Sequence, residues 1–259
     1  MGESAGLNTL TRSAGASIAF RRSPALDPDL PGVMFCGGFR SNMSGGKAEY
    51  LEARCRTRGQ AFLRFDYGGH GESDGRFEDG TIGSWLADTL AVLDAETEGP
   101  QILVGSSMGG WIAVLAALAR PGRIAGLLGI ASAPDFTEAL IWDRLPESER
   151  AALRRDGILL RPSDYDETPD PITLRLVEEG RDHLILGGPV SLAVPVRLIH
   201  GMADADVPWQ QSLRLAERIT SPDVRLTLVK DGEHRLSRPD DLALIADELE
   251  RLCACIHGG

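Results

Sequence analysis

The sequence predicts an α/β fold in which a mostly parallel, eight-stranded sheet carries helices on both faces and a helical cap is inserted into the core. First, short apolar runs rich in β-branched residues alternate with longer helical stretches, which is typical of a parallel sheet covered by crossover helices. Second, the chain has 259 residues, enough for one large α/β domain with an insertion. Third, 42% hydrophobic and 25% charged residues are ordinary for a globular protein.

Strands are expected where short apolar runs lie between turn residues, and helices where apolar residues recur at helical spacing. An N-terminal pair at 8–12 and 17–21 is expected to form an antiparallel edge. The parallel strands are expected at 32–36, 61–66, 101–105, 124–133, 194–201 and 224–232. The covering helices are expected at 45–58, 81–97, 108–119, 209–219 and 240–255.

One long interval interrupts this alternation. Residues 134–192 separate two strands that a short crossover could have joined, and they contain helical pieces around the Pro/Asp-rich string RPSDYDETPDPI. An insertion of this size with its own helices is more typical of a lid than of a structureless loop. We therefore expect a core made of residues 1–133 and 193–259 and a helical cap at 134–192.

The net charge of −11 disfavours nucleic acids and anionic membrane surfaces as partners. No apolar run approaches the ~18 residues that a membrane span needs. The N-terminal string MGESAGLNTLTRSAGAS has no basic region followed by an apolar core, so we expect neither a secretory signal nor a transit peptide, and a cytoplasmic protein. The four cysteines are scattered, which suggests reduced thiols.

The string ILVGSSMGGWIAVLAALA places small polar residues between a predicted strand and a predicted helix. Gly105 to Gly109 fit the Gly-x-Ser-x-Gly nucleophile elbow, in which a strand turns sharply into a helix and holds the central serine at the apex. The positions two before and two after that serine must be small so that strand and helix can pass. Ser107 is therefore the candidate nucleophile.

A serine hydroxyl needs a base and an orienting acid, which follow it along the chain in the order Ser, Asp/Glu, His. HGMADADVP follows one late predicted strand and DGEHRLS follows the last. Asp204 is the candidate acid and His234 the candidate base. Asp206 is the competing acid, but the first aspartate of the His-Gly-x-x-Asp-x-x-Val-Pro pattern is the better match.

Two backbone N–H groups are expected to form an oxyanion hole, one from Met108 after the nucleophile and one from Phe39 in the string CGGFR. The glycine pair before Phe39 lets the backbone approach closely. Arg40 could meet a substrate carboxylate or be a solvated loop charge. Trp142, in the predicted cap, could line the pocket or pack the lid. Both pairs of alternatives stay open.

Taken together, these residues resemble the α/β-hydrolase superfamily over essentially the whole chain. Four strings are similar to a mitochondrial subfamily of this superfamily, the type 10 alpha/beta-hydrolase domain-containing proteins: SNMSGGKA, FLRFDYGGHGESDG, QILVGSSMGGW and RLIHGMADADVPW. That subfamily is known for palmitoyl-protein thioesterase and acyl-glucuronide esterase activity. The resemblance implies Ser107 as nucleophile, Asp204 as acid and His234 as base.

The sequence thus predicts a serine hydrolase that cleaves carboxylic esters or thioesters through an acyl-enzyme, with no metal or organic cofactor. The substrate is expected to be a small-molecule or protein-linked acyl compound. A carbon–carbon bond hydrolase, a perhydrolase and a ligand receptor with a retained triad are the alternatives, whereas dehalogenases of this fold use an aspartate at the elbow. The sequence does not fix acyl chain length, leaving group or oligomeric state.

Overall fold

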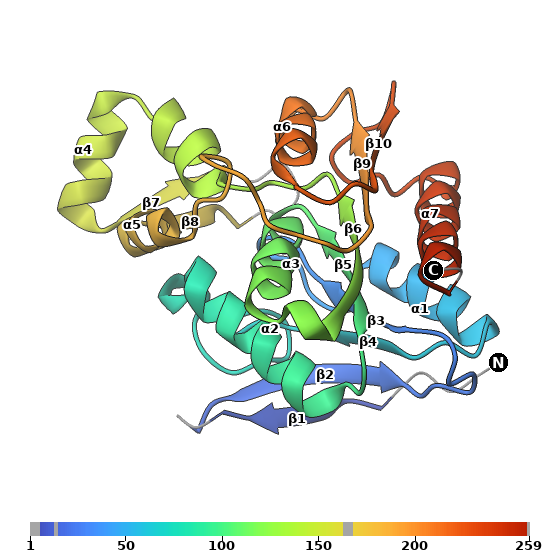
Figure 1. Ribbon diagram of the computed structural model, residues 1–259. Coiled ribbons are helices and arrows are strands. Elements are labelled where there is room, and N and C mark those ends of the chain that lie inside the picture. Colours follow the sequence, from blue (N-terminus) through green and yellow to red (C-terminus); the bar gives the residue numbers. More distant parts are fainter. Residues whose placement is uncertain (1–5, 13–14, 163–167, 258–259) are drawn as a thin grey trace.

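The computed structural model describes residues 6–12, 15–162 and 168–257. Its main element is an eight-stranded sheet in the order β1-β2-β4-β3-β5-β6-β9-β10 (Figure 1). The strands are β1 (Asn8–Thr11), β2 (Ser17–Ser23), β3 (Gly32–Cys36), β4 (Phe62–Phe65), β5 (Gln101–Ser106), β6 (Ile124–Ile130), β9 (Val196–Gly201) and β10 (Val224–Val229). β2 pairs antiparallel with β1 and β4, and the other neighbours are parallel. The predicted fold class is confirmed.

The central strands β3 and β5 are buried along their whole length. Strands covered on both faces have near-continuous apolar sequences, as GVMFC and QILVGS show. Because parallel strands end at the same edge of a sheet, the loops after β3, β5, β9 and β10 meet there. The sheet order therefore gathers the sequence motifs at one edge.

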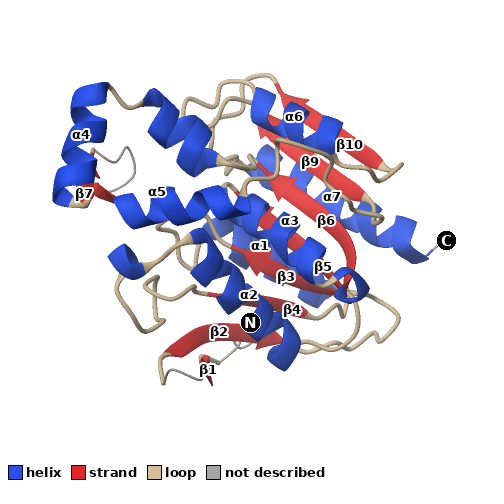
Figure 2. Cartoon of the chain, turned by 60° about the vertical axis from the view of Figure 1, so that its left-hand side comes forward, coloured by secondary structure: helices blue, strands red, loops and turns tan. Residues whose placement is uncertain are grey.

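Helices cover both faces of the sheet (Figure 2). The helices are α1 (Gly46–Thr57), α2 (Ile82–Glu96), α3 (Met108–Ala119), α6 (Gln210–Arg218) and α7 (Pro239–His257). α1 and α7 share one apolar cluster on one face, and α2, α3 and α6 belong to a second cluster on the other. At the start of α2, Thr81 and Ser84 form a reciprocal capping box that satisfies two otherwise unpaired N–H groups.

Residues 134–192, called the insertion below, form a separate group of elements beyond the sheet (Figure 1). They comprise short helical turns at Thr137–Ile141, Trp142–Arg144 and Arg181–His183 together with α4 (Glu147–Asp156), β7 (Ile158–Arg161), β8 (Asp170–Thr173) and α5 (Leu174–Gly180). β7 and β8 form a small antiparallel sheet of their own.

The sequence analysis expected only helical pieces around the Pro/Asp-rich string, so the β7–β8 hairpin was not expected. Gly157 adopts φ +76 and its N–H donates to the Leu153 carbonyl, so it ends α4 in the left-handed conformation. The next residues then pair with β8. Residues 163–167 of the Pro/Asp-rich string lie outside the described residues, as do residues 1–5 of the N-terminal string.

In the described part of the chain, every helix is too short or too polar to cross a membrane.

Candidate active site

Ser107 lies between β5 and α3 with φ 53 and ψ −118, backbone angles that are rare for a residue with a side chain. The turn is tight because a Cβ on Gly105 would lie 2.3 Å from the Gly109 carbonyl oxygen. A Cβ on Gly109 would in turn lie 2.1 Å from the Cys36 carbonyl oxygen at the end of β3. The glycines thus allow β3, β5 and α3 to approach, and the serine hydroxyl is left at the sheet edge.

The loops after β9 and β10 are clamped together by backbone contacts. A Cβ on Gly201 would lie 2.1 Å from the Gly232 carbonyl oxygen. The Met202 N–H donates to the Val229 carbonyl at 2.8 Å, and the Ala203 N–H donates to the Gly232 carbonyl at 3.0 Å. This close approach positions the side chains of Asp204 and His234, which follow in these loops.

The structure brings Ser107, His234 and Asp204 into one chain of hydrogen bonds. Ser107 Oγ lies 3.1 Å from His234 Nε2, and His234 Nδ1 lies 2.7 Å from Asp204 Oδ2. The other carboxylate oxygen of Asp204 accepts the backbone N–H groups of Asp206 and Val207 at 2.9 and 2.8 Å. Asp206, the competing acid, thus contributes its backbone to this arrangement, and its carboxylate lines the cavity described below.

His200 is a further partner of Asp204 that the sequence analysis treated only as a packing residue. Its Nε2 lies 3.1 Å from Asp204 Oδ2 and 2.9 Å from the Val207 carbonyl, and its Nδ1 lies 2.7 Å from Ser212 Oγ. A nitrogen between two acceptors must carry the proton, so Nε2 donates and Nδ1 accepts from the serine. The four-residue spacing between His200 and Asp204 in HGMAD was the signal in the sequence that could have indicated this contact.

The hydrogen bonds around Asp204 favour its ionised form. Burial raises the pKa of this carboxyl, but the hydrogen bonds from His200 and His234 outweigh burial and hold the pKa below its ordinary value. Its side chain is fully buried. Asp204 therefore stays a carboxylate and can stabilise a positive charge on His234.

The loop after β3, residues 37–42, is called the glycine loop below and lies beside Ser107. A Cβ on Gly38 would be 3.5 Å from the Ser107 Cβ, so the loop approaches the serine closely. Within the described residues, the N–H groups of Phe39 and Met108 donate to no protein acceptor. Two unused donors beside a nucleophilic hydroxyl are what an oxyanion needs.

Arg40 connects the glycine loop to two other parts of the chain. Its backbone N–H donates to His70 Nε2 at 3.3 Å, and burial lowers the His70 pKa to about 4, so the ring is neutral and can accept. Its guanidinium donates to the carbonyls of Thr168 and Pro169 and to the Asp170 carboxylate, at 3.1, 2.9 and 2.9 Å. Arg40 is therefore engaged by the insertion. The sequence missed both His70 and this hairpin as its partners.

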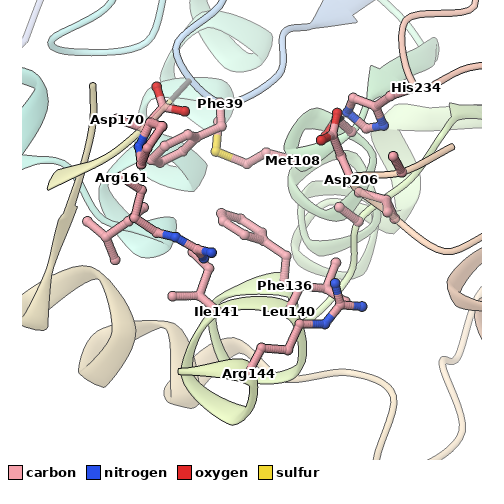
Figure 3. A pocket seen from close by; sticks show the side chains of 16 residues that line it. Phe39, Met108, Phe136, Leu140, Ile141, Arg144, Arg161, Asp170, Asp206 and His234 are labelled. Atoms are coloured by element: carbon pink, nitrogen blue, oxygen red, sulfur yellow. Dashed lines mark hydrogen bonds between the residues drawn. The ribbon is translucent and has the colours of Figure 1, made fainter. Parts of the chain in front are cut away.

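Two cavities meet at Ser107 and His234. The larger, about 540 Å³, lies under the insertion and is lined mainly by apolar side chains (Figure 3). The smaller, about 410 Å³, lies on the side of the glycine loop and the start of α1, and it is called the polar cavity below because most of its lining residues carry polar side chains. Its polar lining includes Arg40, Ser41, Asn42, Lys47, Arg235 and Ser237. Each half of a cleaved acyl compound could thus have its own space.

Trp142 lies elsewhere in the insertion and is not among the residues that line these two cavities. The guanidinium carbons of Arg150, Arg154 and Arg181 lie 5.4, 4.8 and 4.9 Å from its ring centroid. Such contacts between cations and an aromatic ring stabilise the insertion's own packing.

One group of acidic and histidine side chains in the described part of the chain has the spacing of metal ligands, namely Asp204, Asp206 and His234. Asp204 and His234 are directly hydrogen-bonded to each other at 2.7 Å. This direct contact suits a carboxylate that orients the imidazole ring rather than two ligands separated by an ion.

The sheet, the elbow and the Ser–His–Asp hydrogen-bond chain define an α/β-hydrolase of the serine hydrolase class. Residues 31–156 match the family model described as Serine aminopeptidase, S33. The chain is 41% identical to palmitoyl-protein thioesterase ABHD10, mitochondrial, from Mus musculus, over 96% of this chain and 83% of the mouse protein. It therefore belongs to the ABHD10 family.

Two solved structures resemble this one over nearly their whole length. Alpha/beta hydrolase domain-containing protein 10 from mouse is 40% identical with a TM-score of 0.88, covering 96% of this chain and 98% of that one. A protein from Agrobacterium vitis S4 is 39% identical with a TM-score of 0.93, covering 97% and 100%. The fold and much of the sequence are thus shared.

The expectation of a cytoplasmic protein was wrong. All five curated relatives carry the word mitochondrial in their names. A targeting segment is read by a separate machinery and then removed, so the composition of the folded domain carries no information about location.

Proposed function

We propose that this chain is a thioesterase that removes fatty acyl groups from protein cysteines, with Ser107 as nucleophile, His234 as base and Asp204 as orienting acid. The observation that supports it most is the unbroken path from Ser107 Oγ through His234, 3.1 and 2.7 Å, to a buried carboxylate. The names of the curated relatives, which are palmitoyl-protein thioesterases, support the substrate class.

In the first half of the reaction, Ser107 Oγ attacks the acyl carbon while His234 Nε2 takes the hydroxyl proton. The carbonyl opens to an oxyanion, which accepts hydrogen bonds from the Phe39 and Met108 N–H groups. When it collapses, the carbon–sulfur bond breaks and the proton on Nε2 passes to the sulfur. The acyl group is left on the serine and the cysteine departs as a thiol.

In the second half, water replaces the thiol. His234 Nε2 takes a proton from the water as its oxygen adds to the acyl carbon, and the same oxyanion forms again. The bond from the acyl carbon to Ser107 Oγ then breaks, Oγ regains the proton, and the carboxylic acid leaves. Asp204 holds the imidazole in the correct tautomer and stabilises its cation in both halves.

The two cavities support an assignment of the two halves of the substrate. The acyl group occupies the larger, apolar cavity, because hydrocarbon is stabilised by contact with apolar walls. The leaving group occupies the polar cavity beside the glycine loop. The insertion, residues 134–192, then acts as a cap that supplies most of the acyl cavity's far wall.

The proposal is tested by steady-state hydrolysis of acyl thioesters and matched oxygen esters, from acetyl to palmitoyl. Ser107→Ala is expected to lower kcat on the order of 10⁴-fold or more. Ser106→Ala, one residue earlier on β5, is the matched control and is expected to retain activity. A Ser107 acyl-enzyme is expected by intact mass measurement. Unchanged turnover in Ser107→Ala would contradict the proposal, and labelling without turnover would favour a receptor.

A further inference from the structure

Two arginines of the insertion line the same apolar cavity as Ser107. Arg144 ends the short turn Trp142–Arg144, and Arg161 ends β7. Figure 3 shows both side chains extending toward the cavity, with His234 and Met108 at its other side. An arginine is always charged in proteins, so two permanent cations face a space with mainly hydrocarbon walls.

Neither of these guanidinium groups has a hydrogen bond or an ion pair within the described residues. Other arginines of the insertion do: Arg154 pairs with Glu147 at 3.0 Å, and Arg181 pairs with Glu138 at 2.7 Å. Arg175, exposed on α5, also has no such partner within the described residues, but it does not line the cavity. Arg144 and Arg161 are therefore the unpaired arginines of the insertion that a ligand in the cavity could contact.

The carboxylates of the lining do not cancel this charge. Asp170 is bound by the Arg40 guanidinium at 2.9 Å, and Asp206 is the other acid among the described residues that line the cavity. Arg144 and Arg161 thus leave the lining with an excess of positive charge. This local excess opposes the net charge of −11 on the whole chain, which by itself would repel anions.

We propose that Arg144 and Arg161 form a subsite for a carboxylate at the far end of the acyl group, so that the enzyme hydrolyses acyl chains that end in an acid in addition to plain fatty acyl chains. The inference rests on the proposed function, because it assumes acyl transfer to Ser107. The methylenes of such a chain contact the apolar walls, and its end accepts hydrogen bonds from guanidinium groups, whose planar donors match a carboxylate.

A plain hydrocarbon end would contact the same two guanidinium groups without any compensating bond and would displace part of their water. The polar cavity lies on the glycine-loop side of Ser107, so the leaving group has its own place and does not need these arginines. The geometry therefore assigns the anion to the acyl side of the scissile bond.

The test compares thioesters of one neutral thiol that differ only at the end of the acyl chain, such as hexanoyl against 5-carboxypentanoyl and decanoyl against 9-carboxynonanoyl. The readout is the ratio of kcat/KM for the carboxylated and plain members of each pair. Arg161→Gln and Arg144→Gln are each expected to lower this ratio about fivefold, and the double variant more, because each removes one charged hydrogen-bonding partner. Raising the ionic strength should lower the wild-type ratio.

Arg218→Gln is the matched control, because Arg218 is an exposed arginine on α6 whose guanidinium has no partner within the described residues and does not line the cavity. Its ratio should equal that of the wild type. Equal ratios in the wild type and all variants would overturn the inference. Arginine-dependent selectivity seen only when the carboxylate is on the leaving thiol would overturn the acyl-side assignment.

The same assays separate this inference from the proposed function. If Ser107→Ala kept full activity on both members of a pair, acyl transfer to Ser107 would be wrong. If Ser107→Ala abolished hydrolysis while Arg161→Gln and Arg144→Gln left the ratio unchanged, the mechanism would stand and only the carboxylate subsite would be wrong.

Discussion

The sheet edge that carries Ser107 and the insertion hold their charged groups in opposite ways. At the sheet edge, Asp204 is fully buried and accepts hydrogen bonds from two histidines and two backbone N–H groups. In the insertion, Arg144 and Arg161 are exposed and have no protein partner within the described residues. The sheet edge thus fixes the geometry of its charged groups, whereas the insertion leaves two charges available to a ligand.

Arg40 connects these two regions. It lies in the glycine loop of the core, and its guanidinium donates to three acceptors on residues 168–170 of the insertion. The loop that carries the Phe39 N–H is therefore attached to the insertion on one side and to the sheet on the other.

The largest effect is expected at the buried carboxylate. Asp204→Asn should lower kcat on the order of 10⁴-fold, because an amide no longer selects the His234 tautomer or stabilises its cation. Asp206→Asn, two residues on, should change kcat by less than about tenfold, because its backbone N–H contact survives. Steady-state kinetics of both variants decide the point. Comparable losses of kcat in the two variants would mean that Asp204 and Asp206 share the role of orienting acid.

The next effect concerns close packing at the elbow. Gly109→Ala should destabilise the fold by about 3 kcal/mol or more, because the new Cβ would lie 2.1 Å from the Cys36 carbonyl oxygen. Gly187→Ala, in the insertion, has no atom within 4 Å of its added Cβ and should leave stability within about 1 kcal/mol. Urea unfolding measures both. Equal stabilities would contradict the tight elbow.

A third effect is the pH dependence of stability at His70, the buried partner of the glycine loop. Burial lowers its pKa from 6.5 to about 4, so between these values the unfolded chain binds more protons than the folded one. The contribution of His70 to the free energy of unfolding should therefore be constant above pH 6.5 and should be lost as the pH falls toward 4.

The His70 contribution lost in that window is roughly 3 kcal/mol. The measurement is the free energy of unfolding at pH 7 and pH 4 for the wild type and His70→Gln. The wild type should lose more than the variant. If both lost the same amount, protonation of His70 would not be linked to folding.

The smallest effect is expected at Arg40, which connects the glycine loop to the insertion. Arg40→Gln should lower kcat about tenfold by freeing the glycine loop from the insertion, and Asp170→Asn should do so less strongly. In a double-mutant cycle, the two changes should be less than additive, because they remove one shared contact. Additive effects would show that the contact between Arg40 and Asp170 does not position the loop.

More of the core than of the insertion could be predicted from the sequence. In the core, glycine spacing and strand ends identified Ser107, Asp204 and His234, which the structure brings within hydrogen-bonding distance. In the insertion, the β7–β8 hairpin was missed, and the alternatives given for Arg40 did not include its contact with that hairpin. For Trp142 the alternatives were lining the pocket or packing the insertion, and the ring packs among arginines of the insertion.

The sequence by itself determined the parallel sheet, the elbow and the order of the catalytic candidates, because apolar periodicity and close glycine approach are local properties. Only the tertiary structure decided that His70 supports the glycine loop and that two arginines face the larger cavity. These contacts join residues far apart in the chain or depend on how the insertion packs. No local pattern encodes such pairings, since they follow from which surfaces remain to be buried or paired once the sheet has formed.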